Sequence, residues 1–137
     1  MEYSVVLVKP DGMKKHLVGE NISRFEKAGL TLSAIKMVNL TDEVLNNWYV
    51  HHKDKPFFPG LVSFMKETPV VAMVWSGEGV ILKIRDLAGA TDPTKAAAGT
   101  IRADFGEEIQ RNIIHASDSL EGAEKEKNLI FKPEEIL

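Results

Sequence analysis

The chain has 137 residues and no cysteine, and its formal net charge is −3. This length predicts one domain with a core of its own, and the shares of hydrophobic and charged residues (44% and 27%) are typical of a globular protein. The lack of cysteine excludes disulfides, cysteine nucleophiles and thiolate metal sites, and the acidic balance argues against a nucleic-acid partner. No apolar run reaches membrane-spanning length and the first strand pattern begins at Tyr3, so we expect no signal peptide, no membrane partner and a cytoplasmic location.

The first half of the chain alternates strand and helix patterns. Residues 3–8 form a nearly continuous apolar run, typical of a buried central strand, and residues 9–12 follow as a turn signal. Residues 18–28 place apolar side chains on one helical face, which predicts a helix that ends at a glycine. Residues 30–40 alternate as a strand, and a helix capped by a threonine or aspartate follows through residue 49.

The second half continues the alternation. A Pro/Gly-containing break precedes a short helix near residues 61–65, and the patterns then predict a strand at 70–75 and a helix at 79–87. A long irregular loop is expected from residue 88 to about 104, and such loops inside compact domains are usually functional. The last strand (113–115), a helix (120–127) and an extended tail follow. This order predicts an α/β (α+β) fold in a single domain, residues 1–137, as a ferredoxin-like sandwich: a four-stranded antiparallel sheet with helices packed on it.

His115 stands where the last strand is expected to end. A Ser-Asp-Ser cluster and a helix follow it, so unpaired helix N–H groups and their positive field lie close by, an arrangement that suits a phosphate. A histidine in that place can act as a nucleophile. Taken alone, a histidine in this place is better explained as a polar residue that ends a strand, and only its neighbours favour a functional role.

Other polar groups lie at the ends of apolar elements. Lys9, Arg85 and Arg102 each have a plain explanation as surface charge, and Thr91 as a turn former. Together with the histidine they supply the groups needed to hold a polyphosphate and attack it. Neither of the glycine-rich phosphate-binding motifs occurs, so side chains would have to hold the phosphates.

Several distinctive stretches follow one another along the chain: Val-Lys-Pro-Asp-Gly (8–12), His-Lys-Asp-Lys-Pro-Phe-Phe (52–58), Pro-Val-Val-Ala-Met-Val-Trp (69–75), Gly-Ala-Thr-Asp-Pro (89–93), Gly-Thr-Ile-Arg-Ala-Asp-Phe (99–105), Arg-Asn-Ile-Ile-His-Ala-Ser-Asp-Ser (111–119) and Ala-Glu-Lys-Glu (123–126). In this order they resemble the nucleoside diphosphate kinase family over about 120 of the 137 residues.

The resemblance implies transfer of the γ-phosphate of a nucleoside triphosphate, typically ATP, to a nucleoside diphosphate, which maintains NTP and dNTP pools. The route it implies is ping-pong, through a phosphohistidine. His115 matches the nucleophile, which attacks through Nδ1, and Glu126 matches the carboxylate that takes the other ring N–H. Ser117 matches a hydroxyl that supports the arrangement of Lys9 and this glutamate.

The resemblance also implies the nucleotide contacts. Lys9 and Asn112 match the pair that binds the ribose hydroxyls, the lysine also lies near the transferring phosphoryl group, and Phe57 matches the aromatic ring on which the base stacks. The two arginines and the threonine match phosphate ligands, with a tyrosine and a histidine beside them. The complete set of implied substrate-binding residues is Lys9, Tyr49, His52, Phe57, Leu61, Arg85, Thr91, Arg102, Ile109 and Asn112.

The expected cofactor and partners follow from the same resemblance. Mg²⁺ should arrive on the triphosphate, with no dedicated protein metal site and with Asp118 at most a contact through water. The partners are nucleoside tri- and diphosphates with any base, because stacking on a ring does not discriminate. We also expect a homo-oligomer, a tetramer or hexamer, and the end of the chain at Leu137 favours a tetramer or smaller assembly.

Three positions depart from the family pattern. Ala116 replaces the usual glycine after the histidine, which restricts positive φ at that point of the chain. Asp92 and Ala98 replace an asparagine and a proline in the long loop, where they bear on subunit contacts.

A second reading is a catalytically reduced, nucleotide-binding or regulatory member of the same fold. Loss of the nucleophile or of a phosphate-binding cation would favour it. The histidine and all three cations are present.

Overall fold

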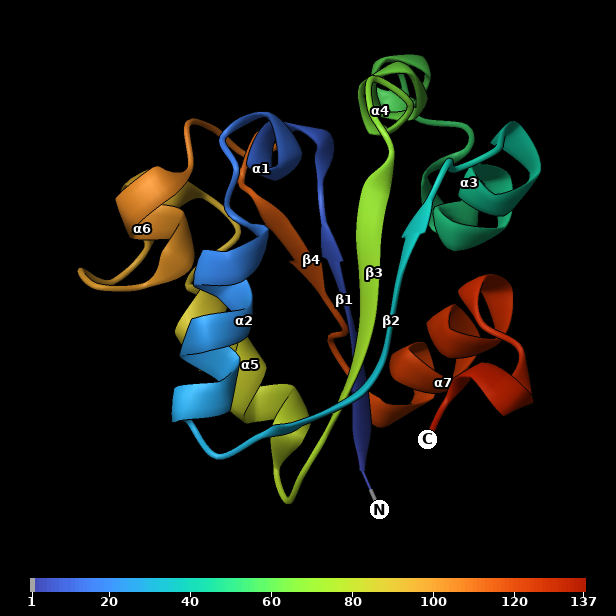
Figure 1. The fold of residues 1–137 in the computed structure, drawn as a ribbon. Helices are drawn as coiled ribbons and strands as arrows, with labels where there is room; N and C mark the ends of the chain where they lie inside the picture. Colours follow the sequence, from blue (N-terminus) through green and yellow to red (C-terminus); the bar gives the residue numbers. More distant parts are fainter. Residues whose placement is uncertain (1) are drawn as a thin grey trace.

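Four strands form one antiparallel sheet. They are β1 (Tyr3–Val8), β2 (Thr31–Val38), β3 (Val70–Ser76) and β4 (Ile114–Ala116), and they lie in the order β2-β3-β1-β4. The computed structural model describes residues 2–137, and Figure 1 shows the sheet with its helices. The strand order and the antiparallel pairing confirm the predicted ferredoxin-like α+β fold.

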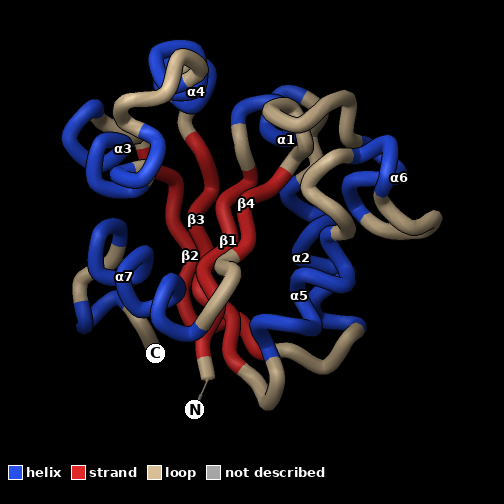
Figure 2. Tube along the Cα trace, turned by 180° about the vertical axis from the view of Figure 1, so that it is seen from behind, coloured by secondary structure: helices blue, strands red, loops and turns tan. Residues whose placement is uncertain are grey.

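Helices cover both faces of the sheet, as seen from opposite sides in Figures 1 and 2. One face carries α1 (Pro10–Lys14), α2 (Val18–Lys27), α5 (Val80–Ala88) and α6 (Ile101–Phe105). The other face carries α3 (Asp42–Trp48), α4 (Phe58–Met65) and α7 (Leu120–Ile130). Short 3-10 helices occur at Val50–His52, Pro93–Lys95 and Pro133–Glu135.

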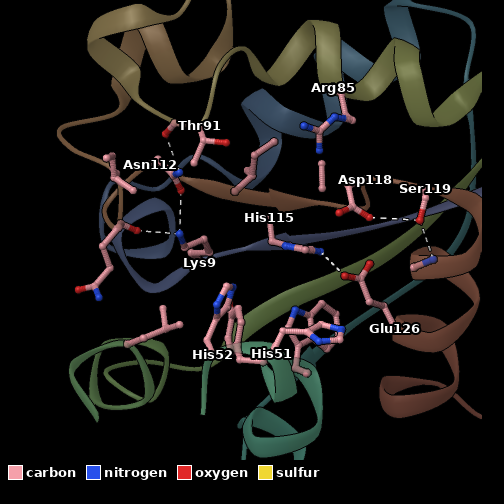
Figure 3. A pocket seen from close by; sticks show the side chains of 18 of the residues that line it. Lys9, His51, His52, Arg85, Thr91, Asn112, His115, Asp118, Ser119 and Glu126 are labelled. Carbon is pink, nitrogen blue, oxygen red and sulfur yellow. Dashed lines mark hydrogen bonds and ion pairs between the residues drawn. The ribbon is translucent and has the colours of Figure 1, made fainter. Parts of the chain in front are cut away.

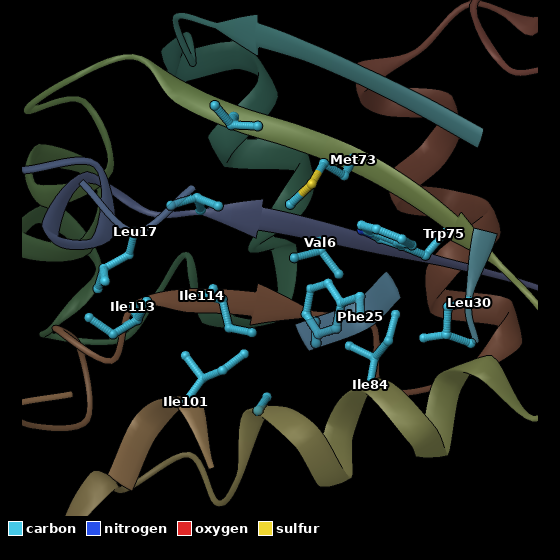
Figure 4. Packing of buried hydrophobic residues seen from close by; sticks show 14 of the residues in the cluster. Val6, Leu17, Phe25, Leu30, Met73, Trp75, Ile84, Ile101, Ile113 and Ile114 are labelled. Carbon is cyan, nitrogen blue, oxygen red and sulfur yellow. The ribbon is translucent and has the colours of Figure 1, made fainter. Parts of the chain in front are cut away.

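The two faces of β1 explain its uninterrupted apolar sequence. Val6 and Val8 enter the core beneath α2 and α5, whereas Val5 and Leu7 enter the core beneath α3 and α4. Because both faces of this central strand are buried, it shows no alternation of apolar and polar residues. Figure 4 shows the first of these cores, in which Phe25 meets Trp75 edge-on with ring centroids 5.2 Å apart.

Five segments differ from the sequence-based expectation. Helix α4 begins at Phe58, inside the expected break, and the last strand covers Ile114–Ala116, so His115 lies within the strand and not at its end. Residues 9–12, expected as a turn, begin α1, because proline suits the first position of a helix. The expected irregular loop at 88–104 contains a 3-10 helix and the start of α6, whose cap is the side chain of Thr100, which accepts a hydrogen bond from the N–H of Ala103. The expected extended tail begins later, since α7 continues to Ile130.

Among residues 2–137, no helix is both long enough and apolar enough to cross a membrane.

Phe25 provides a test of the core beneath α2. Its side chain is fully buried, so Phe25→Ala should lower the free energy of unfolding by about 3–5 kcal/mol through lost burial and a cavity. Urea denaturation followed by circular dichroism measures this loss. Leu82→Ala removes an exposed leucine from α5 and should change stability by less than about 0.5 kcal/mol. Equal losses for the two variants would contradict this packing.

Candidate active site

One cleft brings together nearly all of the residues singled out from the sequence. Its volume is about 850 Å³, and Figure 3 shows the side chains around it. Ser117 does not line the cleft and lies fully buried behind it. The sequence-predicted residues that do line it are Lys9, Tyr49, His52, Phe57, Leu61, Arg85, Thr91, Arg102, Ile109, Asn112, His115, Asp118 and Glu126.

The pairing of β4 with β1 sets the direction of His115. Within this three-residue strand, Ile114 and Ala116 point into the core beneath α2 and α5. Because side chains alternate along a strand, His115 faces the other way, opposite Leu7, and reaches the cleft. The imidazole therefore sits on a strand that is hydrogen-bonded to the centre of the sheet.

A carboxylate on α7 faces one ring nitrogen of His115. The Nε2 atom lies 2.8 Å from Oε2 of Glu126, although the ring N–H is not well aligned with that oxygen. Contacts of this kind often become aligned only when substrate binds. A proton on Nε2 would face this carboxylate, and the lone pair would then lie on Nδ1.

The buried Ser117 holds this carboxylate in place. Its hydroxyl donates to Oε1 of Glu126 at 2.6 Å and accepts the backbone N–H of Val5 at 2.9 Å. The carboxylate is thereby tied to β1 through a side chain that never reaches solvent. The serine makes no hydrogen bond with Lys9, whose partners lie elsewhere.

Lys9 and Asn112 meet at the end of β1. The Nζ atom of Lys9 donates to the side-chain oxygen of Asn112 and to the carbonyl of Gln110, both at 2.7 Å. The asparagine amide donates to the carbonyl of Thr91 at 2.9 Å, which connects the pair to the loop after α5. The pKa of Lys9 is lowered to about 8, chiefly by burial; the charge of Asp11 opposes this shift and that of Arg102 contributes to it.

The backbone between Asn112 and the last strand is strained. Ile113 has φ 77°, and the N–H of Ile114 donates to the carbonyl of Asn112 at 2.9 Å, which closes a three-residue γ-turn. A β-branched residue in this region costs about 1–3 kcal/mol, so surrounding contacts must hold it. Ala116, by contrast, lies in β4 and its φ is not positive, so an alanine fits at this position without backbone strain.

Arg102 braces the same segment from α6. Its guanidinium donates to the carbonyls of Gly89, Asn112 and Ile114 at 2.9, 3.3 and 2.8 Å. Burial lowers the pKa of this arginine to about 10, and the charge of Arg85 adds to the effect. Arg85 points toward His115 from α5 (Figure 3). Two arginines and a buried lysine thus repel one another around the histidine, and a polyanion would relieve this repulsion.

Aromatic and apolar side chains form another part of the cleft wall. Phe57 and Ile109 are large apolar residues left exposed, and the ring of His52 lies 5.4 Å from that of Phe57 and 6.3 Å from that of Tyr49. Burial raises the pKa of Tyr49, with the charge of Glu126 adding to it, so the phenol keeps its proton. Exposed rings at a polar cleft can accept a flat ligand.

Within residues 2–137, no group of three or more His, Asp or Glu side chains is placed to hold a metal ion. Asp118 is exposed at the cleft and accepts a hydrogen bond from Ser119 at 3.2 Å. An exposed carboxylate oxygen of this kind is a ligand that suits a hydrated divalent cation.

Trp48 and Gln110 are among the contributors to the cleft that were not singled out from the sequence. Trp48 packs edge-on against His115 with ring centroids 5.1 Å apart, and its position on α3 had suggested only a helix-face residue. Gln110 contributes a backbone carbonyl, which no side-chain pattern could reveal.

Known proteins are similar to this chain in sequence and in fold. The family model "Nucleoside diphosphate kinase" matches residues 2–136. The chain belongs to the nucleoside diphosphate kinase family. It is 50% identical to a nucleoside diphosphate kinase of Thermosynechococcus vestitus over 137 residues, which are 100% of this chain and 91% of that one.

Two solved structures of the family are similar to the whole fold. The structure of a nucleoside diphosphate kinase family protein from Babesia bovis has a TM-score of 0.96 and 46% identity, and the match covers 100% of this chain and 93% of that one. The Halobacterium salinarum nucleoside diphosphate kinase in complex with CDP has a TM-score of 0.96 and 42% identity, with 99% and 91% covered. Nucleoside diphosphate kinases are phosphotransferases and in general require a divalent cation.

The burial of Lys9 predicts an effect of pH on the stability of this protein. The folded protein binds the proton of this lysine more weakly than the unfolded chain does, because the pKa falls from 10.5 to about 8 on folding. The free energy of unfolding of the wild type, relative to Lys9→Met, should therefore rise between pH 8 and 10.5, by up to about 3 kcal/mol.

Urea denaturation at a series of pH values measures this difference. The same comparison with Lys55→Met, which removes an exposed lysine, should give a difference that does not depend on pH. A wild-type advantage over Lys9→Met that is flat or falls across this range would contradict the burial of a charged lysine.

Proposed function

We propose that this protein transfers the γ-phosphate of a nucleoside triphosphate, typically ATP, to a nucleoside diphosphate by a ping-pong route through His115. One observation carries the proposal: the imidazole of His115 is fixed on a strand with its Nε2 atom next to the carboxylate of Glu126. The three cations Lys9, Arg85 and Arg102 line the same cleft. A nucleophile activated and oriented by a neighbouring group is the arrangement that covalent catalysis requires.

In the first half-reaction, Nδ1 of His115 attacks the γ-phosphorus in line with the leaving oxygen. The Nδ1–P bond forms, the bond from phosphorus to the bridging oxygen breaks, and the electron pair leaves with the nucleoside diphosphate. Positive charge that develops on the ring is stabilised by Glu126 through Nε2–H, while Ser117 keeps the carboxylate oriented. The second half-reaction is the reverse, with a different diphosphate as the acceptor.

The cations contribute position and electrostatics. Arg85 and Arg102 would bind the phosphate oxygens together with Thr91, since phosphoryl transfer depends on charge stabilisation at those oxygens. Lys9 and Asn112 would bind the ribose hydroxyls, and their mutual hydrogen bond of 2.7 Å holds the two side chains ready. When bound, Mg²⁺ carried by the triphosphate neutralises phosphate charge, with Asp118 in reach through water.

The base would stack on Phe57, with Leu61 and Ile109 as apolar neighbours and Tyr49 and His52 toward the phosphates. Such a wall supports the use of purine and pyrimidine nucleotides alike, because stacking needs only a flat ring. In a cell this activity would maintain the NTP and dNTP pools. A homo-oligomer and a cytoplasmic location stay predictions.

Labelling with γ-³²P-ATP and Mg²⁺ tests the proposal directly. The wild type should gain acid-labile, base-stable label, and GDP or CDP should remove it as the triphosphate. His115→Ala should gain no label, whereas His16→Asn, which changes an exposed histidine with φ 58° to a residue that tolerates this conformation, should label normally.

The same experiment separates the two readings of the family fold. Absence of label on a wild type that still binds nucleotide would contradict the kinase proposal and favour the nucleotide-binding, non-catalytic member. Label that persists in His115→Ala would place the nucleophile elsewhere.

Glu126 provides a test of how the ring is activated. Glu126→Gln should lower kcat by about 10- to 100-fold with little change in KM, because the carboxylate acts on the imidazole and not on the nucleotide. Steady-state kinetics at saturating nucleotide measures both parameters. Glu124→Gln removes an exposed carboxylate from the same helix and should leave kcat unchanged. A Glu126→Gln enzyme with wild-type kcat would contradict the role of this carboxylate.

A further inference from the structure

The γ-turn at Ile113 separates two groups that the proposed reaction needs in register. Asn112, the first residue of the turn, is bound to Lys9, and His115 lies two residues after Ile113 on β4. Ile113 itself is fully buried and has no polar side chain that could hold its own backbone. Any change in the turn would therefore move the ribose-binding end of the site relative to the nucleophile.

Residues at the beginning of α1 form hydrogen bonds with both the N–H and the carbonyl of Ile113. The N–H of Ile113 donates to Oδ2 of Asp11 at 2.9 Å, and the carbonyl of Ile113 accepts the backbone N–H of Lys9 at 2.9 Å. Gly12 allows the close approach, because a Cβ atom there would lie 2.9 Å from the carbonyl oxygen of Ile113. The turn is held from outside its own segment, as a strained conformation requires.

Asp11 is buried, with only 3% of its surface exposed, and does not line the cleft. A buried carboxylate is costly unless its contacts repay the desolvation, and Oδ1 of Asp11 has no hydrogen-bond partner among residues 2–137. Its single hydrogen bond goes to the strained turn, and its charge also favours the protonated form of Lys9. Both effects concern the site and neither involves a substrate contact.

We propose that Asp11 is a positioning residue for phosphoryl transfer, which holds the Ile113 γ-turn and through it fixes His115 relative to Asn112. This inference rests on the proposed function. The carboxylate oxygen is required as an acceptor for the N–H of Ile113, and the packing of Gly12 against the Ile113 carbonyl keeps the turn closed.

Kinetics of four variants test this role. Asp11→Ala removes the acceptor and should lower kcat and the rate of phosphoenzyme formation by about 10- to 100-fold, with KM changed less than about threefold. The reason is that a small displacement of the nucleophile lowers the rate of transfer more than it weakens nucleotide binding. Asp11→Asn keeps an acceptor oxygen and should recover most of the rate. Gly12→Ala should lower kcat without removing any polar group, through the steric contact alone.

Leu30→Ala is the control for a merely structural effect. It removes a buried side chain of the core beneath α2 and should lower stability while kcat stays at the wild-type value, measured well below the unfolding midpoint of each variant. If Asp11→Ala does not fold, Asp11→Asn and Gly12→Ala still decide the matter.

The outcomes separate this inference from the proposed function. A wild type that labels, together with Asp11→Ala or Gly12→Ala that label and turn over at the wild-type rate, overturns the role of Asp11 alone. An Asp11→Asn enzyme as slow as Asp11→Ala, or a Leu30→Ala enzyme equally slow, also overturns it. A wild type that never gains acid-labile label overturns the proposed function itself.

Discussion

The pairing of the three-residue strand β4 with the central strand β1 is the constraint on which the site depends. It fixes His115 opposite Leu7 and sends its neighbours into the core, so the histidine has one direction in which to point. The same pairing brings Ser117 against Val5, and the serine in turn holds Glu126. A slip of one residue in this register would turn the imidazole into the core and remove the whole arrangement.

Charge is the second organising feature. Arg102 lies close enough to both Lys9 and Arg85 for their charges to repel, and burial together with this repulsion lowers the pKa of the lysine and of the buried arginine, while the nearby carboxylate of Asp11 opposes the shift at Lys9. Hydrogen bonds from Arg102 and Lys9 to backbone carbonyls and to Asn112 offset the cost of this repulsion in the folded protein. A bound polyphosphate would replace repulsion with attraction, which is how a site built without a glycine-rich loop can still select phosphates.

The sequence predicted the fold well where the pattern of apolar residues and the turn-forming Gly and Pro residues indicate the same element boundaries. The buried strand at residues 3–8 and the helix that ends before Gly29 are examples, because each pattern reflects burial by neighbours that the topology supplies. The irregular loop at 88–104 was only partly right, since a local cap at Thr100 starts a helix too short for periodicity to show. The position of His115 at a strand end before a Ser-Asp-Ser cluster singled it out without the family resemblance, and the cations at the ends of apolar elements stood out in the same way. Glu126 was found only through the resemblance, because a lone glutamate on a helix is expected to be solvated. The γ-turn at Ile113 had no sequence signal, because its strain is imposed by contacts from α1 and α6 that only the folded chain brings together.

The stereochemical course at phosphorus tests the central claim, passage of the phosphoryl group through His115, most directly. Transfer from ATP with a chiral, isotopically labelled γ-thiophosphate to GDP would be followed by configurational analysis of the product. Two in-line displacements, onto the histidine and off it, predict net retention of configuration. Net inversion would mean a single direct transfer between nucleotides and would contradict the account.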